Sequence, residues 1–185
     1  MSKGFSATRV EDVARKAGIS KAAIYLYFRN KDALLSELIE CSIVPVIDDV
    51  QALAAQSQLS PQKAIISCIE KAAAKLSDPR AAAIPRIVLA EAALFPQIAA
   101  MYHRRVIQPG FNAIGLILQN GINRGIFRPV DIDAATRMIL APLLVHFVFE
   151  PLLCPGEGGG CETDIFVRNH ADAVFHGLLA KGEPA

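Results

Sequence analysis

The residues of this sequence best suited to chemistry on a partner are the basic ones at its N-terminal end. Residues 1–31 contain seven lysines and arginines against two acidic residues, a net charge of +5. The complete chain of 185 residues carries +1, so residues 32–185 together carry −4. A basic end on an otherwise acidic chain favours contact with a polyanion such as a nucleic acid, although a solvated charged surface gives the same pattern.

Several residues among these charges have the chemistry that DNA recognition uses. Hydroxyl groups, ammonium groups and helix N-termini bind phosphate oxygens, which suits Thr8, Tyr25, Tyr27 and Lys31. The small side chains of Ala22 and Ala23 allow close approach to bases, and a methyl group there can meet that of thymine. The sequence therefore predicts these DNA-binding residues: Thr8, Ser20, Lys21, Ala22, Ala23, Tyr25, Leu26, Tyr27 and Lys31.

Two short helices and a tight turn are needed to position these side chains. Thr8 and Glu11 match a capping box at the start of the first helix, and Gly18 ends it. Ser20 is placed to cap a second helix, and Asn30 a third. Apolar residues at helical spacing are expected to form one small core between these helices: Val10, Val13, Ala14, Ile19, Ile24 and Phe28.

Such a helix-turn-helix leaves the outer face of its second helix open, and the N-terminal end of that helix can enter the major groove of DNA. Apolar spacing and a glycine stop by themselves also fit a capped helical hairpin with no role in DNA binding. The clustered tyrosines, the positive charge and the lysine that opens the third helix favour DNA binding.

The remainder of the chain indicates helices divided by prolines and capping residues. Apolar residues from Leu34 to Leu53 recur at helical spacing, which predicts one long helix bent at Pro45. Alternation typical of strands is not seen, so the predicted fold class is all-α, with eight or nine helices. Later helix starts are predicted at Ser60-Pro61, Asp78-Pro79, Pro109, Asp131 and Thr163.

The N-terminal stretch resembles the DNA-binding signature of TetR-type transcriptional regulators. The resemblance rests on Gly18-Ile19-Ser20-Lys21, Tyr25-Leu26-Tyr27-Phe28 and Lys31-Asp32-Ala33-Leu34-Leu35, and it covers about a fifth of the chain closely. A weaker resemblance to C-terminal domains of that family runs from Leu89 to Asp131.

The resemblance implies a small helix-turn-helix domain over residues 1–44 and a larger helical domain for ligand binding and dimerisation over residues 45–185. It implies a homodimer held by residues 131–150 and 164–180, which fits the almost uniformly apolar segment 138–149. A regulator of this type binds an inverted-repeat operator in double-stranded DNA. It usually represses, and it leaves the operator when a small molecule binds.

A cavity for that small molecule is expected between the DNA-binding end and the dimer helices. Its lining should be mostly apolar, which suits a small hydrophobic effector with few polar groups. Polar residues that could face into it, predicted as candidate ligand contacts, are Arg86, Glu91, His103, Asn112 and His146.

Other classes of protein find little support. The start of the chain has no apolar signal sequence, and the apolar run Met138–Phe149 is too short to span a bilayer, so a cytoplasmic protein with no membrane partner is expected. No spacing indicates a catalytic, metal or cofactor site. Two alternatives stay open: a dimeric helical interaction or ligand-binding module that has lost DNA binding, and an all-α enzyme.

The four cysteines are few and widely spaced, which favours reduced thiols over a disulfide scaffold. Cys154 and Cys161 flank the glycine-rich stretch 156–160, where a redox role is conceivable, but the phosphate-loop pattern is missing.

Regulators that resemble this chain carry a full helix ahead of the position of Gly4. Three residues cannot form an isolated helix, because nucleation alone fixes about three residues for one hydrogen bond. The sequence therefore predicts a truncated first helix and a lack of cover for Phe5, Val10 and part of the Leu34 face.

Overall fold

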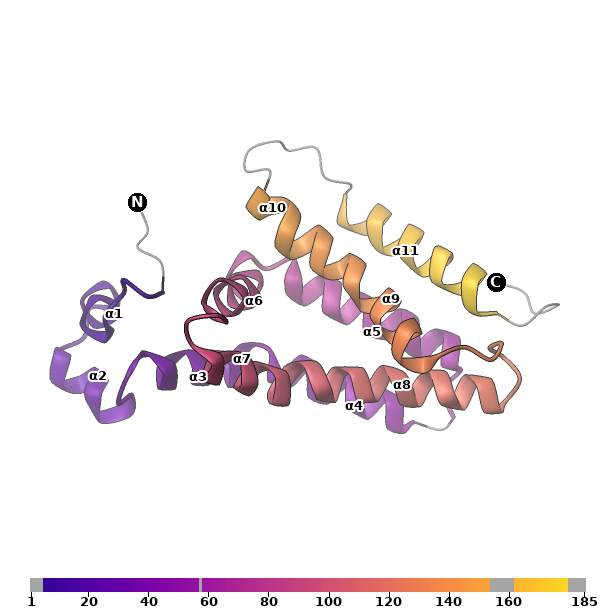
Figure 1. The fold of residues 1–185 in the computed structure, drawn as a ribbon, viewed down its shortest axis with the longest axis horizontal. Coiled ribbons are helices and arrows are strands. Elements are labelled where there is room, and N and C mark those ends of the chain that lie inside the picture. The colour runs from indigo at the N-terminus through magenta and orange to yellow at the C-terminus, as the bar shows by residue number, and fades with distance from the viewer. Residues whose placement is uncertain (1–4, 57, 154–161, 180–185) are drawn as a thin grey trace.

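The fold is that of a computed structural model, which describes residues 5–56, 58–153 and 162–179. The predicted all-α class is confirmed, because the described residues form helices and no strand beyond one isolated bridge, Phe127 to Leu179. The molecule is elongated, with α1 and α2 at one end and α9 and α11 side by side towards the other (Figure 1). The small N-terminal unit and the larger helical bundle therefore occupy different ends of the molecule.

The N-terminal unit contains α1 (Val10–Ala17) and α2 (Lys21–Tyr27). Gly18 ends α1 with φ of 71°, a left-handed conformation that glycine adopts at low cost. The Ser20 hydroxyl accepts a hydrogen bond from the Ala23 amide at 3.1 Å, so the predicted cap of α2 is confirmed. The cap of α1 lies one residue later than predicted: Arg9 precedes the helix, and its amide donates to Asp12 at 3.2 Å.

The long helix predicted from Leu34 to Leu53 is wrong, because the structure has two helices there. Helix α3 (Lys31–Ser42) ends before Ile43, and α4 (Val44–Ala55) starts with Pro45 in its first turn. Proline lacks an amide hydrogen and is tolerated where a helix begins, so the chain starts a new helix at this proline rather than bending an existing one. The predicted cap at Asn30 is confirmed, since its side chain accepts from the Ala33 amide at 2.8 Å.

The C-terminal bundle holds the remaining helices, and the starts predicted at Ser60-Pro61, Asp78-Pro79, Asp131 and Thr163 are confirmed. Pro109 instead lies inside a continuous helical rod, one position into α8. The bounds are α5 (Pro61–Leu76), α6 (Pro79–Glu91), α7 (Pro96–Tyr102), η1 (His103–Ile107), α8 (Gln108–Asn123), α9 (Ile132–Leu144), η2 (Val145–Phe149), α10 (Glu150–Leu153) and α11 (Thr163–Leu178).

The segments η1 and η2 are single π-helical turns within continuous helical rods. The first ends two residues before Pro109, and the second begins three residues after Pro142. Each proline removes one backbone donor from the helical ladder, which allows the neighbouring turn to widen.

Three hydrophobic clusters hold the chain together. The N-terminal cluster buries Val10, Ala14 and Ile24, whereas Ile19, a predicted member, is 47% exposed because it lies in the turn between α1 and α2. Two larger clusters lie where α3 meets α6 and α7, and between α5, α8, α9 and α11. Helix α3 supplies Leu34 to the N-terminal cluster and Leu35 to the next one.

The lack of cover predicted for Val10 is wrong, and that for Phe5 holds only in part. Val10 is 6% exposed because Ala14 and Ile24 pack against it. Phe5 is half-buried, and its ring meets the edge of the Phe95 ring with centroids 6.1 Å apart. Contacts from α1, α2 and the α6–α7 connection therefore cover much of this surface.

The apolar helical segment is longer than the sequence run suggested. Residues 132–149 form 18 helical residues with a mean hydropathy of 1.6, which by length and composition alone is enough to cross a membrane. A third of the segment is buried within the single chain. The core helix of a bundle passes the same test, and Ile139 and Leu143 are nearly fully buried here.

The close approach of α8 to Phe127 gives a stability prediction. A Cβ atom at Gly121 would overlap the Phe127 ring, which is itself 1% exposed. We expect Gly121→Ala to lower the free energy of unfolding by about 1–3 kcal/mol through overpacking, measured by urea denaturation. Adding Phe127→Leu should make the loss smaller than the sum of the two single changes. Additive losses would contradict the steric cause.

Candidate DNA interface and effector cavity

The outer face of α2 carries most of the predicted DNA-binding residues. Lys21, Ala22 and Tyr25 are exposed there, and Leu26 and Tyr27 are 83% and 80% exposed. Two large exposed side chains side by side, next to Lys21 and Tyr25, form a small apolar and basic surface that is suited to contact another molecule.

Other predicted residues of this group are engaged within the protein. Ala23 is half-buried, and its amide hydrogen is bound by the Ser20 hydroxyl. Thr8 is half-buried just before α1, and its amide donates to the Phe5 carbonyl at 3.1 Å. The structure thus brings together the outer residues of α2 but places Thr8 and Ala23 partly inside.

Lys31 is the most strongly engaged of the predicted phosphate contacts. Its ammonium group donates to the carbonyl oxygens of Phe5, at 3.2 Å, and Ser6, at 3.0 Å. It also lies 4.7 Å from the Phe5 ring centroid and 5.2 Å from that of Phe95. Two of its three donors hold the N-terminal segment, so a phosphate contact at Lys31 stays a prediction for the remaining donor.

Glu91 anchors the same N-terminal segment to α6. It is buried, at 7% exposure, and it accepts hydrogen bonds from the Ser6 amide, at 3.2 Å, and the Ser6 hydroxyl. A buried carboxylate needs such partners, because burial without them is costly. Glu91 was predicted as a ligand contact, but the structure places it as a link between α6 and the start of the chain.

Glu11, which the sequence did not single out, lies beside the exposed face of α2. Its carboxylate lies 2.9 Å from the Lys21 ammonium group and accepts a hydrogen bond from the Tyr25 hydroxyl at 3.1 Å. The available signal was its position on α1, facing a lysine and a tyrosine one helical turn apart on α2.

An apolar cavity of about 150 Å³ lies within the C-terminal bundle, between α4, α5, η1, α8 and α9. The end of α3 reaches it through Ile43. Its wall includes Ile43, Val46, Val50, Ala72, Val106, Ile107, Phe111, Ile114 and Leu143.

Few polar groups line this cavity. Burial raises the pKa of the Tyr102 hydroxyl to about 12 and the pKa of the Cys68 thiol to about 12, so both are neutral at physiological pH. Lys75 is the one charged residue of the wall. The cavity can therefore hold an apolar body and offer it a few polar contacts.

None of the five predicted ligand contacts lines this cavity. Arg86 donates to the backbone carbonyls of Phe147, at 2.8 Å, and Val148, at 3.2 Å. His146 stacks on the Phe166 ring with centroids 4.2 Å apart, while His103 and Asn112 are exposed. A ligand role for any of them therefore stays a prediction, outside the cavity.

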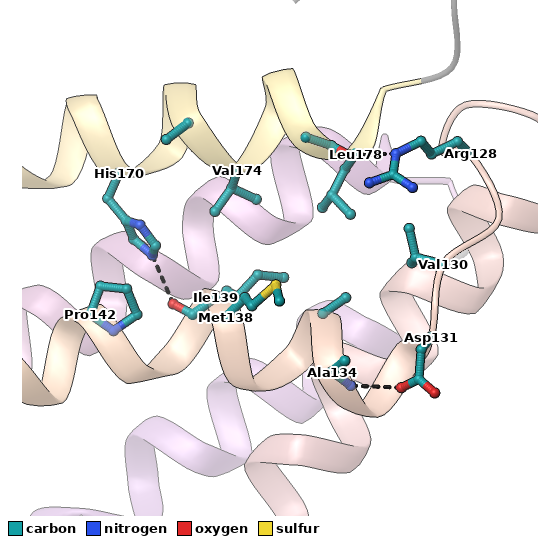
Figure 2. Close-up of a pocket in the computed structure, with 13 residues that line it drawn as sticks. Arg128, Val130, Asp131, Ala134, Met138, Ile139, Pro142, His170, Val174 and Leu178 are labelled. Atoms are coloured by element: carbon teal, nitrogen blue, oxygen red, sulfur yellow. Dashed lines mark hydrogen bonds between the residues drawn. The ribbon is translucent and has the colours of Figure 1, made fainter.

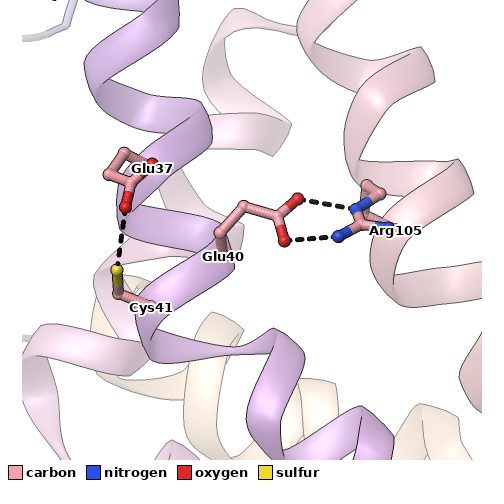
Figure 3. A network of polar contacts seen from close by, with 4 residues as sticks. All are labelled: Glu37, Glu40, Cys41 and Arg105. Carbon is pink, nitrogen blue, oxygen red and sulfur yellow. Dashed lines mark hydrogen bonds and ion pairs between the residues drawn. The ribbon is translucent and has the colours of Figure 1, made fainter.

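The π-turn η1 connects the cavity wall to α3. Val106 and Ile107 line the cavity. The neighbouring Arg105 donates two hydrogen bonds to the Glu40 carboxylate of α3, from Nε at 2.6 Å and from Nη2 (Figure 3). The Arg105 guanidinium holds the pKa of Glu40 below its usual range, so this pair is ionised at neutral pH. Figure 3 also shows Cys41, whose thiol donates to Glu37 on the same helix.

An open groove of about 510 Å³ runs between α9 and α11. Figure 2 shows Met138, Pro142 and Val174 along it, with Arg128 and Asp131 at one end. His170 spans the two helices by donating to the Ile139 carbonyl at 2.7 Å. Met138 is 71% exposed, so this face leaves apolar surface uncovered in a single chain.

Within the part of the chain that the structure describes, no group of three acidic, histidine or cysteine residues could hold a metal ion. Cys41 and Cys68 are free thiols, one exposed and one buried. The predictions for Cys154, Cys161 and the glycine-rich stretch between them fall outside the described residues.

The comparisons with known families agree with this arrangement. Residues 1–38 match the family described as "Bacterial regulatory proteins, tetR family", and residues 60–155 match "Tetracyclin repressor-like, C-terminal domain". The second match alone covers half of the chain, so the chain belongs to the TetR family. It is therefore a DNA-binding transcriptional regulator.

Individual relatives extend the similarity over nearly the whole length. The HTH-type transcriptional regulator YdeS of Bacillus subtilis is 27% identical over 97% of this chain and 84% of its own. A TetR-family regulator from Mesorhizobium loti has a similar fold (TM-score 0.74, 20% identity, 96% of this chain and 90% of its own). The ketosteroid transcriptional regulator KstR2 of Mycobacterium tuberculosis is also similar (TM-score 0.71, 20% identity, 97% and 88%).

The contacts of Lys31 give a prediction for the N-terminal unit. We expect Lys31→Met, which keeps the apolar stem, to lower the free energy of unfolding by about 1 kcal/mol through lost charge-assisted hydrogen bonds and cation–π contacts. Amide hydrogen exchange should speed up across residues 8–28. The matched change Lys16→Met, at an exposed position of α1, should leave exchange unaltered. Equal exchange in the two variants would show that Lys31 does not hold this unit.

Proposed function

We propose that this regulator is an effector-responsive repressor that binds an inverted-repeat operator as a homodimer. The main support for the proposal is the position of η1. This turn lines the apolar cavity on one side, and its Arg105 binds Glu40 of α3 on the other. Helix α3 starts beside α2, and Ile43, which directly follows the end of α3, lines the cavity. A molecule that displaces η1 would therefore also displace α3, and with it α2.

The proposed effector is a small hydrophobic molecule with a single polar group. A volume of about 150 Å³ with a largely apolar lining has room for a molecule about the size of benzene. Tyr102 lines the cavity, and its neutral hydroxyl provides one hydrogen-bonding position for a polar group on that molecule. Among relatives, KstR2 is named for ketosteroids, which are also largely apolar.

The proposed DNA contacts lie on α2, within a DNA-binding domain over residues 1–44. The N-terminal end of a recognition helix meets base edges, which assigns Lys21 and Ala22 to bases. Tyr25 and Leu26 are exposed one helical turn further along the same face, so we assign them to bases as well, and Tyr27 to the backbone. Two such helices one DNA turn apart require a two-fold dimer. The uncovered α9–α11 groove supports a dimer through residues 131–150 and 164–180, and a cytoplasmic location follows from the DNA target.

The direct test is selection of duplexes by the full chain from a random DNA library at about 150 mM salt. We expect enrichment of an inverted repeat whose half-sites lie about 10 base pairs apart. If no sequence is enriched above its frequency in the starting library, the proposed operator binding is wrong.

The groove between α9 and α11 gives a prediction for assembly. We expect Met138→Glu to produce folded monomers, because a dimer would bury an unpaired carboxylate in an apolar interface. Light scattering at micromolar concentration measures the mass, and operator affinity should fall with it. Leu94→Glu, which changes another residue of 70% exposure, serves as the control and should stay dimeric. A dimeric Met138→Glu would place the interface elsewhere.

The cavity gives a prediction for the effector response that needs no known effector. We expect Ala72→Met to fill part of the cavity, raise the melting temperature and weaken operator binding at least about fivefold, at the low end of usual allosteric couplings. Leu116→Met, on the exposed face of α8, is the control and should change neither quantity.

The link between η1 and α3 through Arg105 and Glu40 is tested by adding a second substitution. Arg105→Gln in the Ala72→Met background should restore operator affinity, since the link between η1 and α3 is then cut. A melting temperature that rises while operator affinity stays unchanged in Ala72→Met would show that the cavity is not coupled to the DNA-binding unit.

A further inference from the structure

Glu11 closes a three-residue cluster on the DNA-facing surface. One carboxylate oxygen lies 2.9 Å from the Lys21 ammonium group and also accepts the Tyr25 hydroxyl at 3.1 Å. The Lys21 nitrogen is in turn 5.8 Å from the centroid of the Tyr25 ring. Each member of the cluster therefore touches both of the others.

The electrostatics of the cluster keep Glu11 charged. Its hydrogen bond from Lys21, followed by those from its own backbone amide and from Tyr25, lowers the pKa of Glu11 to about 2. The same contact raises the pKa of Lys21. An ionised carboxylate thus occupies one of the hydrogen-bonding directions of the Lys21 ammonium group.

The consequence differs for phosphates and for bases. A phosphate that pairs with Lys21 must displace Glu11 and is repelled by it, which costs part of the gain from counterion release. A base acceptor in the major groove can bind a second hydrogen of the same ammonium group while Glu11 keeps the first. The carboxylate also holds the Tyr25 side chain in one orientation.

We propose that Glu11 is a specificity-determining residue that suppresses sequence-independent phosphate binding by Lys21 and orients Lys21 and Tyr25 for base contacts. This inference rests on the proposed role of α2 in DNA binding. An exposed ion pair usually adds little to stability, since the Lys21 side chain is 69% exposed, so the effect is expected in DNA binding rather than in folding.

The test uses Glu11→Gln in the full chain, with fluorescence anisotropy on the selected operator and on a scrambled duplex over a series of KCl concentrations. We expect affinity for the scrambled duplex to rise about fivefold, which corresponds to about 1 kcal/mol. The salt slope on that duplex should steepen by about 0.9, as expected for one more phosphate contact. The ratio of operator to scrambled affinity should fall.

Three further variants identify the cause. Glu37→Gln removes the same charge from α3, where the carboxylate contacts Cys41, and should change neither slope nor ratio. Glu11→Gln should have no effect on the slope in a Lys21→Met background. Tyr25→Phe, which removes only the hydroxyl, should lower affinity for the operator but not for the scrambled duplex.

Two results would overturn the inference. Equal gains on both duplexes in Glu11→Gln and Glu37→Gln would show a general charge effect. A lower melting temperature in Glu11→Gln with unchanged slope and ratio would show that Glu11 only joins α1 to α2. If the wild-type chain does not distinguish its selected operator from the scrambled duplex, the proposed function fails first, and the inference fails with it.

Discussion

Packing of α3 in two hydrophobic clusters is the constraint on which the rest of the structure depends. One side of the helix supplies Leu34 to the small N-terminal core, and the other buries Leu35 and Ile39 against α6 and α7. A helix that packs in both clusters joins the N-terminal unit directly to the bundle. The DNA-binding unit is thereby mounted on the bundle by a rigid element rather than by a flexible linker, and Glu40 fixes that element further through Arg105.

Two charged side chains, the buried Glu91 and the half-buried Arg86, serve as internal links between distant segments. Glu91 binds the Ser6 hydroxyl and amide, and Arg86 binds two carbonyls of the π-turn η2. A charge inside a protein requires such partners, and both side chains have them within the chain. The wall of the cavity is mostly aliphatic and aromatic, with Lys75 as its charged residue, which favours a largely apolar effector.

The positive charge of the N-terminal segment overstates what is available to DNA. Lys31 holds the backbone of residues 5 and 6, and Lys21 is paired with Glu11. Both ammonium groups retain donors, but in fixed directions. Such a surface is expected to attract DNA phosphates less strongly than its formal charge of +5 suggests. Its remaining donors are better suited to directional hydrogen bonds.

Local structure followed from the sequence because helix ends depend on residues three or four positions apart. The glycine stop at Gly18 and the caps at Ser20, Asn30 and Asp131 are all formed as predicted. The same local rules did not decide whether Pro45 bends a helix or begins one, since either keeps its apolar residues at helical spacing.

Only the tertiary structure decided which polar residues meet. Glu91 lies 85 residues from Ser6 in the sequence, and Lys31 lies 25 from the same residue, so no spacing pattern connects them. Exposure at Ile19 and burial at Val10 likewise depend on how α1 and α2 cross. The sequence by itself determined the helices, their caps and the family motif, because those features are local. The partners of each charge required the fold, because they come together only when distant helices pack.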